Sequence, residues 1–234
     1  MIIERRSGDR GRVQAGWLDS RHTFSFGHFY DPAWMGFGVL RVINEDRVAP
    51  GEGFPTHGHA NMEILSYVLE GALAHKDSTG GGGVIRPGEL QWMGAGHGVE
   101  HSEFNGSDTE PVHFLQIWIQ PDRVNAEPGY AQREVAPPVA GGGWTLLASP
   151  DGIDGSLSMR QDARVLEARL GAGESAGYPL DPGRRYWLHL ARGSARVGGR
   201  ELRAGDALGY SEESGSLELK ADDEVLALLF DLPG

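Results

Sequence analysis

The sequence predicts an all-β protein built from two tandem β-barrels. Short strand-like runs recur along the chain, and clusters of Gly, Pro and Asp separate them, which is typical of sandwiches and barrels. Glycine contributes 36 of 234 residues, about twice its usual share, and it suits turns better than helices. A chain of 234 residues is long enough for one large β domain or for two small fused ones.

The first half carries four runs rich in β-branched and aromatic residues, at residues 37–48, 63–69, 90–93 and 112–120. Turn-forming clusters lie between them, at residues 49–51, 86–88 and 94–98. Four consecutive glycines at residues 80–83 predict a loose hairpin loop. We assign them no phosphate-binding role, because no Lys-Ser or Lys-Thr pair follows them.

The strand pattern stops at residues 121–134, which are polar, and a Pro- and Gly-rich linker is expected at residues 136–143. It resumes in four further runs, at residues 144–148, 164–170, 186–191 and 225–231. We therefore expect a boundary near residue 140, with an N-terminal barrel at residues 1–140 and a C-terminal barrel at residues 141–234.

The two halves share a faint internal repeat. Each half reads as a strand, a glycine turn, a second strand and a Gly-Glu or Gly-Asp turn, with the turns at Gly71 and Gly88 in the first half and at Gly193 and Gly205 in the second. Two related barrels explain this repeat economically. The alternative is chance similarity between glycine-rich hairpins.

Composition excludes several kinds of chemistry. The chain has no cysteine, which excludes disulfides, iron–sulfur clusters, Cys-ligated zinc and cysteine nucleophiles. A bound metal would be held by His, Asp, Glu or backbone groups. The net charge of −12 is spread along the chain with no basic stripe, so direct binding to nucleic acid is not expected.

No segment of the sequence predicts a membrane or export role. The first residues lack the apolar run of a signal peptide, and the apolar run at residues 225–230 is far shorter than a membrane span. We expect a cytoplasmic protein without a membrane partner, and a monomer as the default state.

Two short motifs predict a metal site. His57 and His59 are separated by one residue, and so are His101 and Glu103. In a strand, residues i and i+2 point to the same side. A lone His-x-His pattern is usually two ordinary histidines, but two such pairs on paired strands would bring three imidazoles and a carboxylate together. This donor set suits Fe, Cu, Ni, Mn or Zn.

The same stretches resemble the two cupin motifs. In the first, Gly51 precedes the His-x-His pair and Glu63 follows it, and in the second, Gly88 leads to His101 and Asn105. Residues 57–71 and 91–103, together with the early segment 17–32, are similar to the pirin family of cupins. The resemblance is strong over residues 1–130 and looser beyond them.

Pirins are bicupins, so the resemblance implies two jelly-roll cupin barrels with one metal ion in the N-terminal barrel. It implies metal ligands at His57, His59, His101 and Glu103. Glu63 stays open. Its even spacing from His59 would let it face the metal, and many cupins use this position as a ligand, whereas in pirin-like proteins it is expected nearby without coordinating.

The C-terminal half departs further from the family pattern. Tyr178 and Leu180 stand where the repeat would place a second His-x-His pair, and His189 is the only histidine of that half. A single histidine cannot build a metal site, so we expect the second barrel to bind no metal. We also expect packing or surface roles for His22, His28, His75, His97, His113 and His189.

The resemblance to bacterial pirin-like proteins implies quercetin 2,3-dioxygenase activity. A flavonol would lose its 3-hydroxyl proton to Glu103, or to Glu63 as second candidate, and would react with O2 to release CO. Iron is the expected metal. The alternative is a non-catalytic, metal- and redox-sensing regulator that acts through protein partners. A cupin isomerase or decarboxylase is a weaker third hypothesis.

Overall fold

The structure is a computed structural model that describes residues 1–234. It contains 22 β-strands and two short 3-10 turns, η1 (Ser7–Asp9) and η2 (Ile153–Gly155), and no α-helix. The predicted all-β class is therefore confirmed.

Neither helical turn comes near the length and apolar character that a membrane-crossing helix requires.

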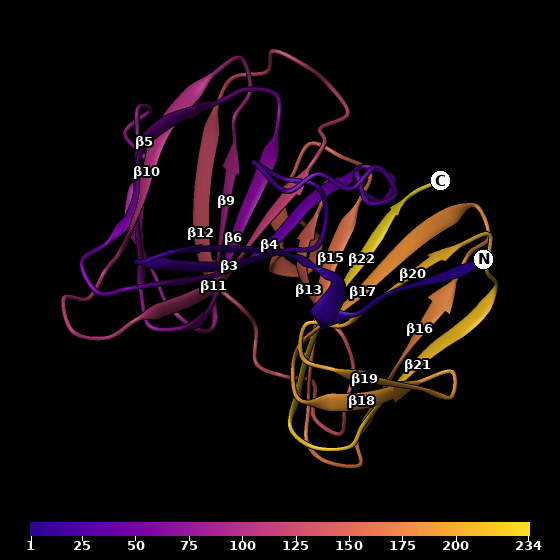
Figure 1. Cartoon of the computed structure of the whole chain (residues 1–234). Coiled ribbons are helices and arrows are strands. Elements are labelled where there is room, and N and C mark those ends of the chain that lie inside the picture. Colours follow the sequence, from indigo (N-terminus) through magenta and orange to yellow (C-terminus); the bar gives the residue numbers. More distant parts are fainter. The chain divides into compact units, whose positions relative to one another are not determined.

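The N-terminal half forms two antiparallel sheets (Figure 1). The larger sheet has seven strands, in the order β12 (Gly129–Glu134), β9 (Glu89–Gly94), β6 (Glu63–Glu70), β11 (Val112–Ile119), β4 (Leu40–Val48), β3 (Leu18–His22) and β2 (Gly11–Ala15). The smaller sheet has four strands, in the order β5 (Gly53–His59), β10 (Val99–Asn105), β7 (Leu73–Asp77) and β8 (Gly82–Ile85).

The C-terminal half repeats this design of seven plus four strands. Its larger sheet has the order β1 (Ile2–Arg5), β20 (Ala207–Ser211), β17 (Arg184–Arg192), β22 (Val225–Pro233), β15 (Arg164–Leu170), β13 (Thr145–Ser149) and β14 (Leu157–Ser158). Its smaller sheet has the order β16 (Ser175–Leu180), β21 (Gly215–Ala221), β18 (Ser194–Val197) and β19 (Arg200–Arg203). The two-barrel architecture predicted from the repeat is confirmed.

All eight strand-like runs of the sequence fall on strands of the structure. The prediction was wrong at residues 129–134, which form β12 although the region 121–134 was expected to break the β pattern. β12 is an edge strand whose side chains are half-buried or exposed, so its sequence carries no alternation of apolar and polar residues.

The chain groups into two compact units. One unit combines Gly11–Val135 with Met159–Gln161, and the other combines Met1–Arg10, Ala136–Ser158 and Asp162–Gly234. The first ten residues lie with the C-terminal strands because β1 pairs with β20, as Figure 1 shows in indigo at the N terminus. The division into residues 1–140 and 141–234 stays a prediction.

The glycine turns of the internal repeat occupy equivalent places. Gly71 connects β6 to β7 and Gly193 connects β17 to β18, and both have a φ of 78°. A Cβ atom would lie 2.5 Å from the carbonyl oxygen of Pro111 at the first turn and 2.2 Å from that of Glu224 at the second. Both turns therefore require glycine, which explains why this part of the repeat is visible in the sequence.

A polar layer crosses the interior of the N-terminal barrel. Ile64, Ser66 and Val68 alternate along β6 and so point to the same side, but Ile64 belongs to one apolar cluster and Val68 to another. The row that contains the serine crosses four strands, through Gln91, Ser66, Gln116 and Asn44. This row lies between the two apolar clusters, and its side chains support the site described below.

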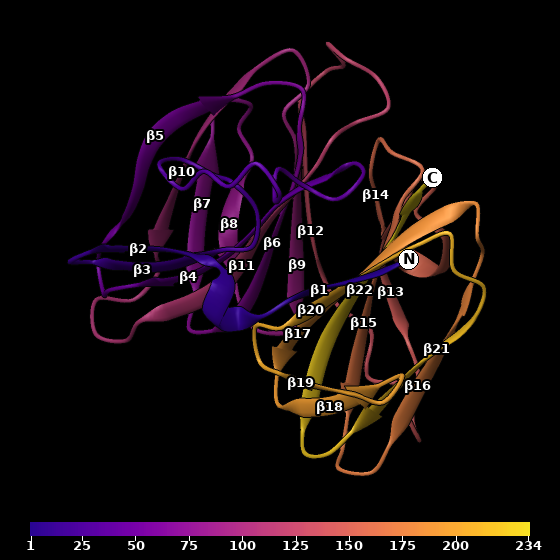
Figure 2. The same cartoon turned by 45° about the vertical axis from the view of Figure 1, so that its right-hand side comes forward.

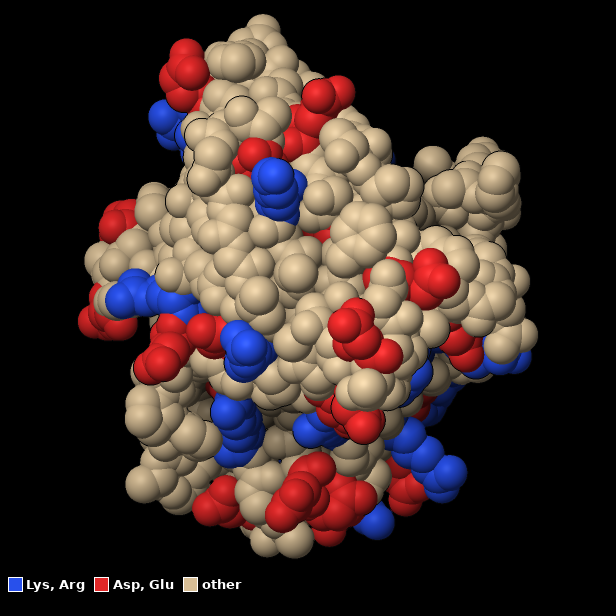
Figure 3. All heavy atoms as spheres, turned by 90° about the vertical axis from the view of Figure 1, so that its left-hand side faces the viewer, with Lys and Arg blue, Asp and Glu red and all other residues tan.

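Charged side chains are interspersed on the face shown in Figure 3. Lys and Arg stand singly or in small groups among Asp and Glu, and the basic side chains form no continuous stripe on this face. The distribution agrees with the even spread of charge along the sequence.

Candidate metal centre

The two strands that carry the predicted motifs are neighbours. β5 and β10 pair antiparallel, with His101 opposite His57 and Val99 opposite His59, and they run side by side in Figure 2. Alternate residues of β5 share a face, so His57 and His59 point the same way and His101 joins them from the next strand. The two motif strands therefore pair, which is the condition under which their side chains can converge.

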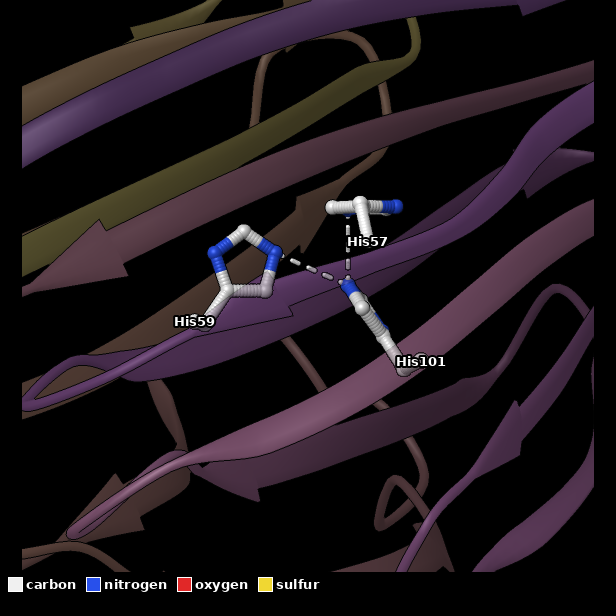
Figure 4. Close-up of side chains that lie close together, drawn as sticks. All are labelled: His57, His59 and His101. Carbon is white, nitrogen blue, oxygen red and sulfur yellow. Dashed lines mark hydrogen bonds between the residues drawn. The ribbon is translucent and has the colours of Figure 1, made fainter.

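Three imidazole nitrogens converge on one place (Figure 4). The Nε2 atom of His101 lies 2.9 Å from Nε2 of His59 and 3.0 Å from Nε2 of His57. Two ligand nitrogens bound to one metal ion at about 2.1 Å and at right angles are about 3 Å apart. The three histidines therefore fit as ligands of a single divalent ion.

The surroundings orient two of these rings. The Nδ1 atom of His57 lies 2.8 Å from the carbonyl oxygen of Pro55. A carbonyl oxygen only accepts, so Nδ1 carries the proton and Nε2 keeps its lone pair for the centre. Trp118 packs edge-on against His59, with ring centroids 4.8 Å apart and planes at 80°.

Two of the imidazoles are held in the uncharged form that a metal requires. Burial lowers the pKa of His59 to about 4 and that of His101 to about 3, and the neighbouring His57 adds to both shifts. A protonated imidazole nitrogen cannot bind a metal ion. At neutral pH these two rings can therefore bind an ion without first releasing a proton to the solvent.

Glu103 is buried beside His101 on the same face of β10. Its Oε1 accepts a hydrogen bond from Ser66 Oγ at 3.1 Å, and its Oε2 accepts one from Gln116 Nε2 at 2.7 Å. Burial raises the pKa of Glu103, although both hydrogen bonds oppose the shift. The carboxylate forms a close group with His75 and His101, in which the ligand atoms lie within 4.8 Å of one another, rather than with the other two histidines.

Glu63, the second carboxylate singled out by the sequence, is not brought to the histidines. It precedes Ser66 by three residues on β6 and so points to the opposite face of the sheet. Its Oε2 accepts hydrogen bonds from Trp92 Nε1 at 2.8 Å and from the backbone N–H of Arg160 at 2.9 Å. Even spacing implies a shared face only within one strand, and His59 and Glu63 lie on different strands, β5 and β6.

His75 and Asp77 lie against the three clustered histidines, a placement that the sequence analysis did not predict. β7 pairs with β10 so that His75 is opposite Glu103 and Asp77 is opposite His101. The Nδ1 atom of His75 lies 3.4 Å from Nδ1 of His101. The signal was present in the sequence, because these two residues have the same i, i+2 spacing as the two predicted ligand pairs.

The remaining five histidines fall outside both close groups: His22, His28, His97, His113 and His189. His113 is buried, and its Nε2 lies 2.9 Å from Glu45 Oε1. His97 is exposed, and its Nε2 lies 3.3 Å from Glu127 Oε2. These contacts agree with the packing role expected for His113 and the surface role expected for His97.

Both halves of the chain match known protein families. A family model described as Pirin matches residues 5–119, and a model described as Quercetinase C-terminal cupin domain matches residues 146–232. The two matches fall on the two halves in which the structure repeats its sheets.

Relatives of similar length support the same grouping. Quercetin 2,3-dioxygenase from Escherichia coli (strain K12) is 43% identical over 233 residues, which cover 100% of this chain and 99% of that protein. A crystal structure of the bacterial pirin YhhW from Escherichia coli in complex with nickel(II) is 42% identical with a TM-score of 0.94, covering 100% of this chain and 99% of the other. The protein YhaK from Escherichia coli is 32% identical with a TM-score of 0.74, covering 94% and 99%.

Proposed function

This chain belongs to the pirin family, and from that premise we propose that it is a metal-dependent dioxygenase that opens the ring of a flavonol such as quercetin. The observation that carries the proposal is the convergence of three imidazole Nε2 atoms in a chain that is similar over its full length to a quercetin 2,3-dioxygenase. The reaction consumes O2 and yields CO and a depside.

We assign the nitrogen ligands to His57, His59 and His101 and the oxygen ligand to Glu103. The donors are all nitrogen and oxygen, which suits iron, copper, nickel, manganese or zinc. We propose iron as the working metal. The similar bacterial pirin crystallised with nickel(II) makes nickel the first competitor.

A divalent ion held there would supply Lewis acidity, which lowers the pKa of a hydroxyl group that approaches it. Glu103 would then take the proton of the flavonol 3-hydroxyl. Burial raises the pKa of Glu103, which favours the protonated form that this step produces.

Ser66 can follow a change in the protonation of Glu103. Its Oγ lies 3.1 Å from Glu103 Oε1 and 2.8 Å from Gln116 Oε1, and a hydroxyl donates only one hydrogen bond at a time. When Glu103 is ionised, Ser66 donates to it. When Glu103 is protonated, its O–H donates to Ser66 and the serine donates to Gln116, so all the polar groups of this network are paired. In the ionised state Gln116 Oε1 loses that donor, and the network therefore favours the protonated form.

Aromatic side chains next to the cluster favour a flat substrate. Trp118 contacts His59, and Phe26 packs edge-on against Trp118 with ring centroids 5.3 Å apart. The indole N–H of Trp118 is buried without a hydrogen-bond partner. A polyphenol would offer a ring to the aromatic groups and an oxygen to this donor.

The test combines metal analysis with turnover. The purified protein is analysed for metals, loaded with Fe2+ or Ni2+, and mixed with quercetin in the presence and absence of O2. We expect O2-dependent loss of flavonol absorbance with release of CO, and loss of both metal and turnover in His57→Ala and His101→Ala. His113→Phe removes a buried histidine of the same barrel and should keep both properties.

Two outcomes would count against the proposal. Full metal content in both ligand variants would overturn the ligand assignment. Stoichiometric metal without turnover, together with recovery of one stoichiometric protein partner, would favour the regulatory alternative.

The proposed enzyme is a cytoplasmic monomer, and light scattering after size-exclusion chromatography tests its oligomeric state.

A further inference from the structure

Asp77 is held rigidly at the end of β7. Its Oδ1 accepts three hydrogen bonds, from the backbone N–H and hydroxyl of Thr79 and from the backbone N–H of Gly81, at 2.8, 2.7 and 2.9 Å. Burial alone would raise the pKa of Asp77, but the hydrogen bonds from Thr79, His75 and the turn backbone outweigh it and lower the pKa. Asp77 is therefore an ionised carboxylate in a nearly inaccessible position.

The free oxygen of this carboxylate sets the proton position on His75. Asp77 Oδ2 lies 3.1 Å from His75 Nε2, and an ionised carboxylate only accepts. His75 Nε2 is therefore the donor, and in a neutral ring Nδ1 is left as the acceptor. Gln91 Nε2 approaches the same Nδ1 at 3.4 Å, as expected for an acceptor.

The acceptor on His75 faces a metal ligand. His75 Nδ1 lies 3.4 Å from His101 Nδ1, while the other ring nitrogen of His101 points at His57 and His59. We propose that Asp77 and His75 are positioning residues, which keep the proton of His101 on Nδ1 and so leave its Nε2 free for the metal ion. The inference rests on the proposed function, because it requires a metal ion at the histidine cluster.

One neighbour fixes the plane of the His75 ring. Tyr130 stacks on its ring, with centroids 5.0 Å apart and planes at 23°. The glycine run expected to be a loose loop makes room for this arrangement, because a Cβ at Gly81 would lie 2.3 Å from Asp77 Oδ2 and 2.9 Å from Tyr130. The last two glycines of the run, Gly82 and Gly83, belong to β8 and not to the loop that was predicted for residues 80–83.

The sharpest variant is Asp77→Asn, which keeps the size of the side chain. An Asn Oδ1 preserves the three hydrogen bonds of the turn and places an N–H donor where Oδ2 was. His75 must then accept on Nε2, donate from Nδ1 and push the proton of His101 onto Nε2. Loss of such support for a metal-bound histidine typically weakens metal binding about 10- to 100-fold.

Metal affinity is the first measurement. The dissociation constant for Zn2+ is determined by competition with a chromophoric chelator in the wild type, Asp77→Asn and His75→Phe, with circular dichroism as the check on folding. We expect about 10- to 100-fold weaker binding in both variants. The matched control is Glu45→Gln, which neutralises the carboxylate that pairs with buried His113 in the same barrel and should leave the constant unchanged.

The proton positions are the second measurement. In 15N-labelled, metal-free protein, ring 15N shifts report which nitrogen of each histidine carries the proton. We expect the proton of His101 on Nδ1 in the wild type and on Nε2 in Asp77→Asn. A wild-type His101 with its proton on Nε2 would overturn the inference even if both variants fail to fold, and so would a wild-type dissociation constant in a folded Asp77→Asn protein.

Failure of this inference differs from failure of the proposed function. If His57→Ala loses Zn2+ and Asp77→Asn binds it normally, the site stands and only the positioning role is overturned. If His57→Ala keeps the wild-type affinity, the metal site itself is wrong.

Discussion

The two barrels share one frame and differ in what fills it. In both barrels, the four-stranded sheet contains an equivalent pair of neighbouring strands, β5–β10 in the first barrel and β16–β21 in the second. His101 lies opposite His57 in the first barrel, and Leu217 lies opposite Tyr178 in the second. The pair that belongs to the proposed metal site in one barrel is a packing contact in the other.

The substitution of apolar for polar side chains extends across the larger sheet. The row Gln91, Ser66, Gln116 and Asn44 of the first barrel corresponds to the row Leu208, Leu188, Leu229 and Leu166 of the second. All four leucines are buried, and they belong to a single apolar cluster. In the first barrel, the polar row separates two smaller clusters.

The two interiors differ in the free-energy cost of the groups that they bury. A buried polar group costs free energy unless it is hydrogen-bonded, so the first barrel must satisfy Glu103 with Ser66 and Gln116 before it can hold an ion. The corresponding row of the second barrel consists of leucines and has no polar group to satisfy. The same turns and the same strand alternation are therefore compatible with a polar row or with an apolar row inside the barrel.

The largest expected effect tests the apolar interior. Leu188→Ala removes a fully buried side chain of the second barrel and should lower the free energy of unfolding by about 2–5 kcal/mol in urea denaturation. Ser66→Ala at the corresponding place of the first barrel should cost less, about 1–3 kcal/mol, because it leaves a buried acceptor of Glu103 or Gln116 without its donor. An equal cost for both variants would show that the two interiors do not differ as described.

A dependence on pH should belong to the first barrel. Burial raises the pKa of Asp46 to about 7; Ser20 opposes the shift, and Glu103 and Glu45 add to it. The unfolded acid titrates near 4, so between about pH 4 and pH 7 the folded protein holds a proton that the unfolded chain has lost. Stability from this group therefore falls as the pH rises through that window, by about 4 kcal/mol in total at most.

Asp46→Asn isolates this contribution, because the amide is neutral at every pH. Urea denaturation of metal-free wild type and variant at pH 5 and pH 8 should show the wild type losing more stability between the two values. The corresponding residue of the second barrel is Ala168, which has nothing to titrate. A difference between wild type and variant that stays constant with pH would contradict a raised pKa.

Much of the frame could be predicted from the sequence, and the exceptions have physical reasons. The internal repeat was visible in the sequence because its parts are local features. These parts are the glycine turns at Gly71 and Gly193 and the alternating strands on either side of each turn. β1 and β12 were not predicted as partners of the sheets they complete. β1 pairs with β20 at the far end of the chain, and no local pattern reveals such a non-local pairing.

The site was predictable only in part. The ligand pairs stood out because two i, i+2 motifs occurred in glycine-rich contexts, whereas His75 and Asp77 have the same spacing without a motif around them. Their position is set by the register of β7 on β10, which the sequence does not show. The orientation of Glu63 stayed open for a related reason, since even spacing along the chain implies a shared face only within one strand.

A third prediction makes the two barrels more alike. His101→Leu introduces the side chain that the second barrel has at the corresponding position, Leu217. Removing one of the four proposed ligands should cost about 3 kcal/mol of metal-binding free energy, or about a hundred-fold in the dissociation constant. Competition with a chelator measures the loss. A His101→Leu protein that binds Zn2+ as tightly as the wild type would remove His101 from the ligand set.

The smallest expected effect separates the barrels within one molecule. A metal ion at a hundred times its dissociation constant adds about 2.7 kcal/mol to the stability of whatever unfolds with loss of the site, which slows hydrogen exchange about a hundred-fold there. Exchange measured by mass spectrometry with and without Zn2+ should slow in peptides that cover β5, β7 and β10. Peptides that cover β16, β18 and β21 should not change, because those strands contribute no residue to either close group of histidines. Equal slowing in both sets would mean that the barrels open as one cooperative unit. The two interiors would then differ in their side chains, but metal binding would stabilise both barrels equally.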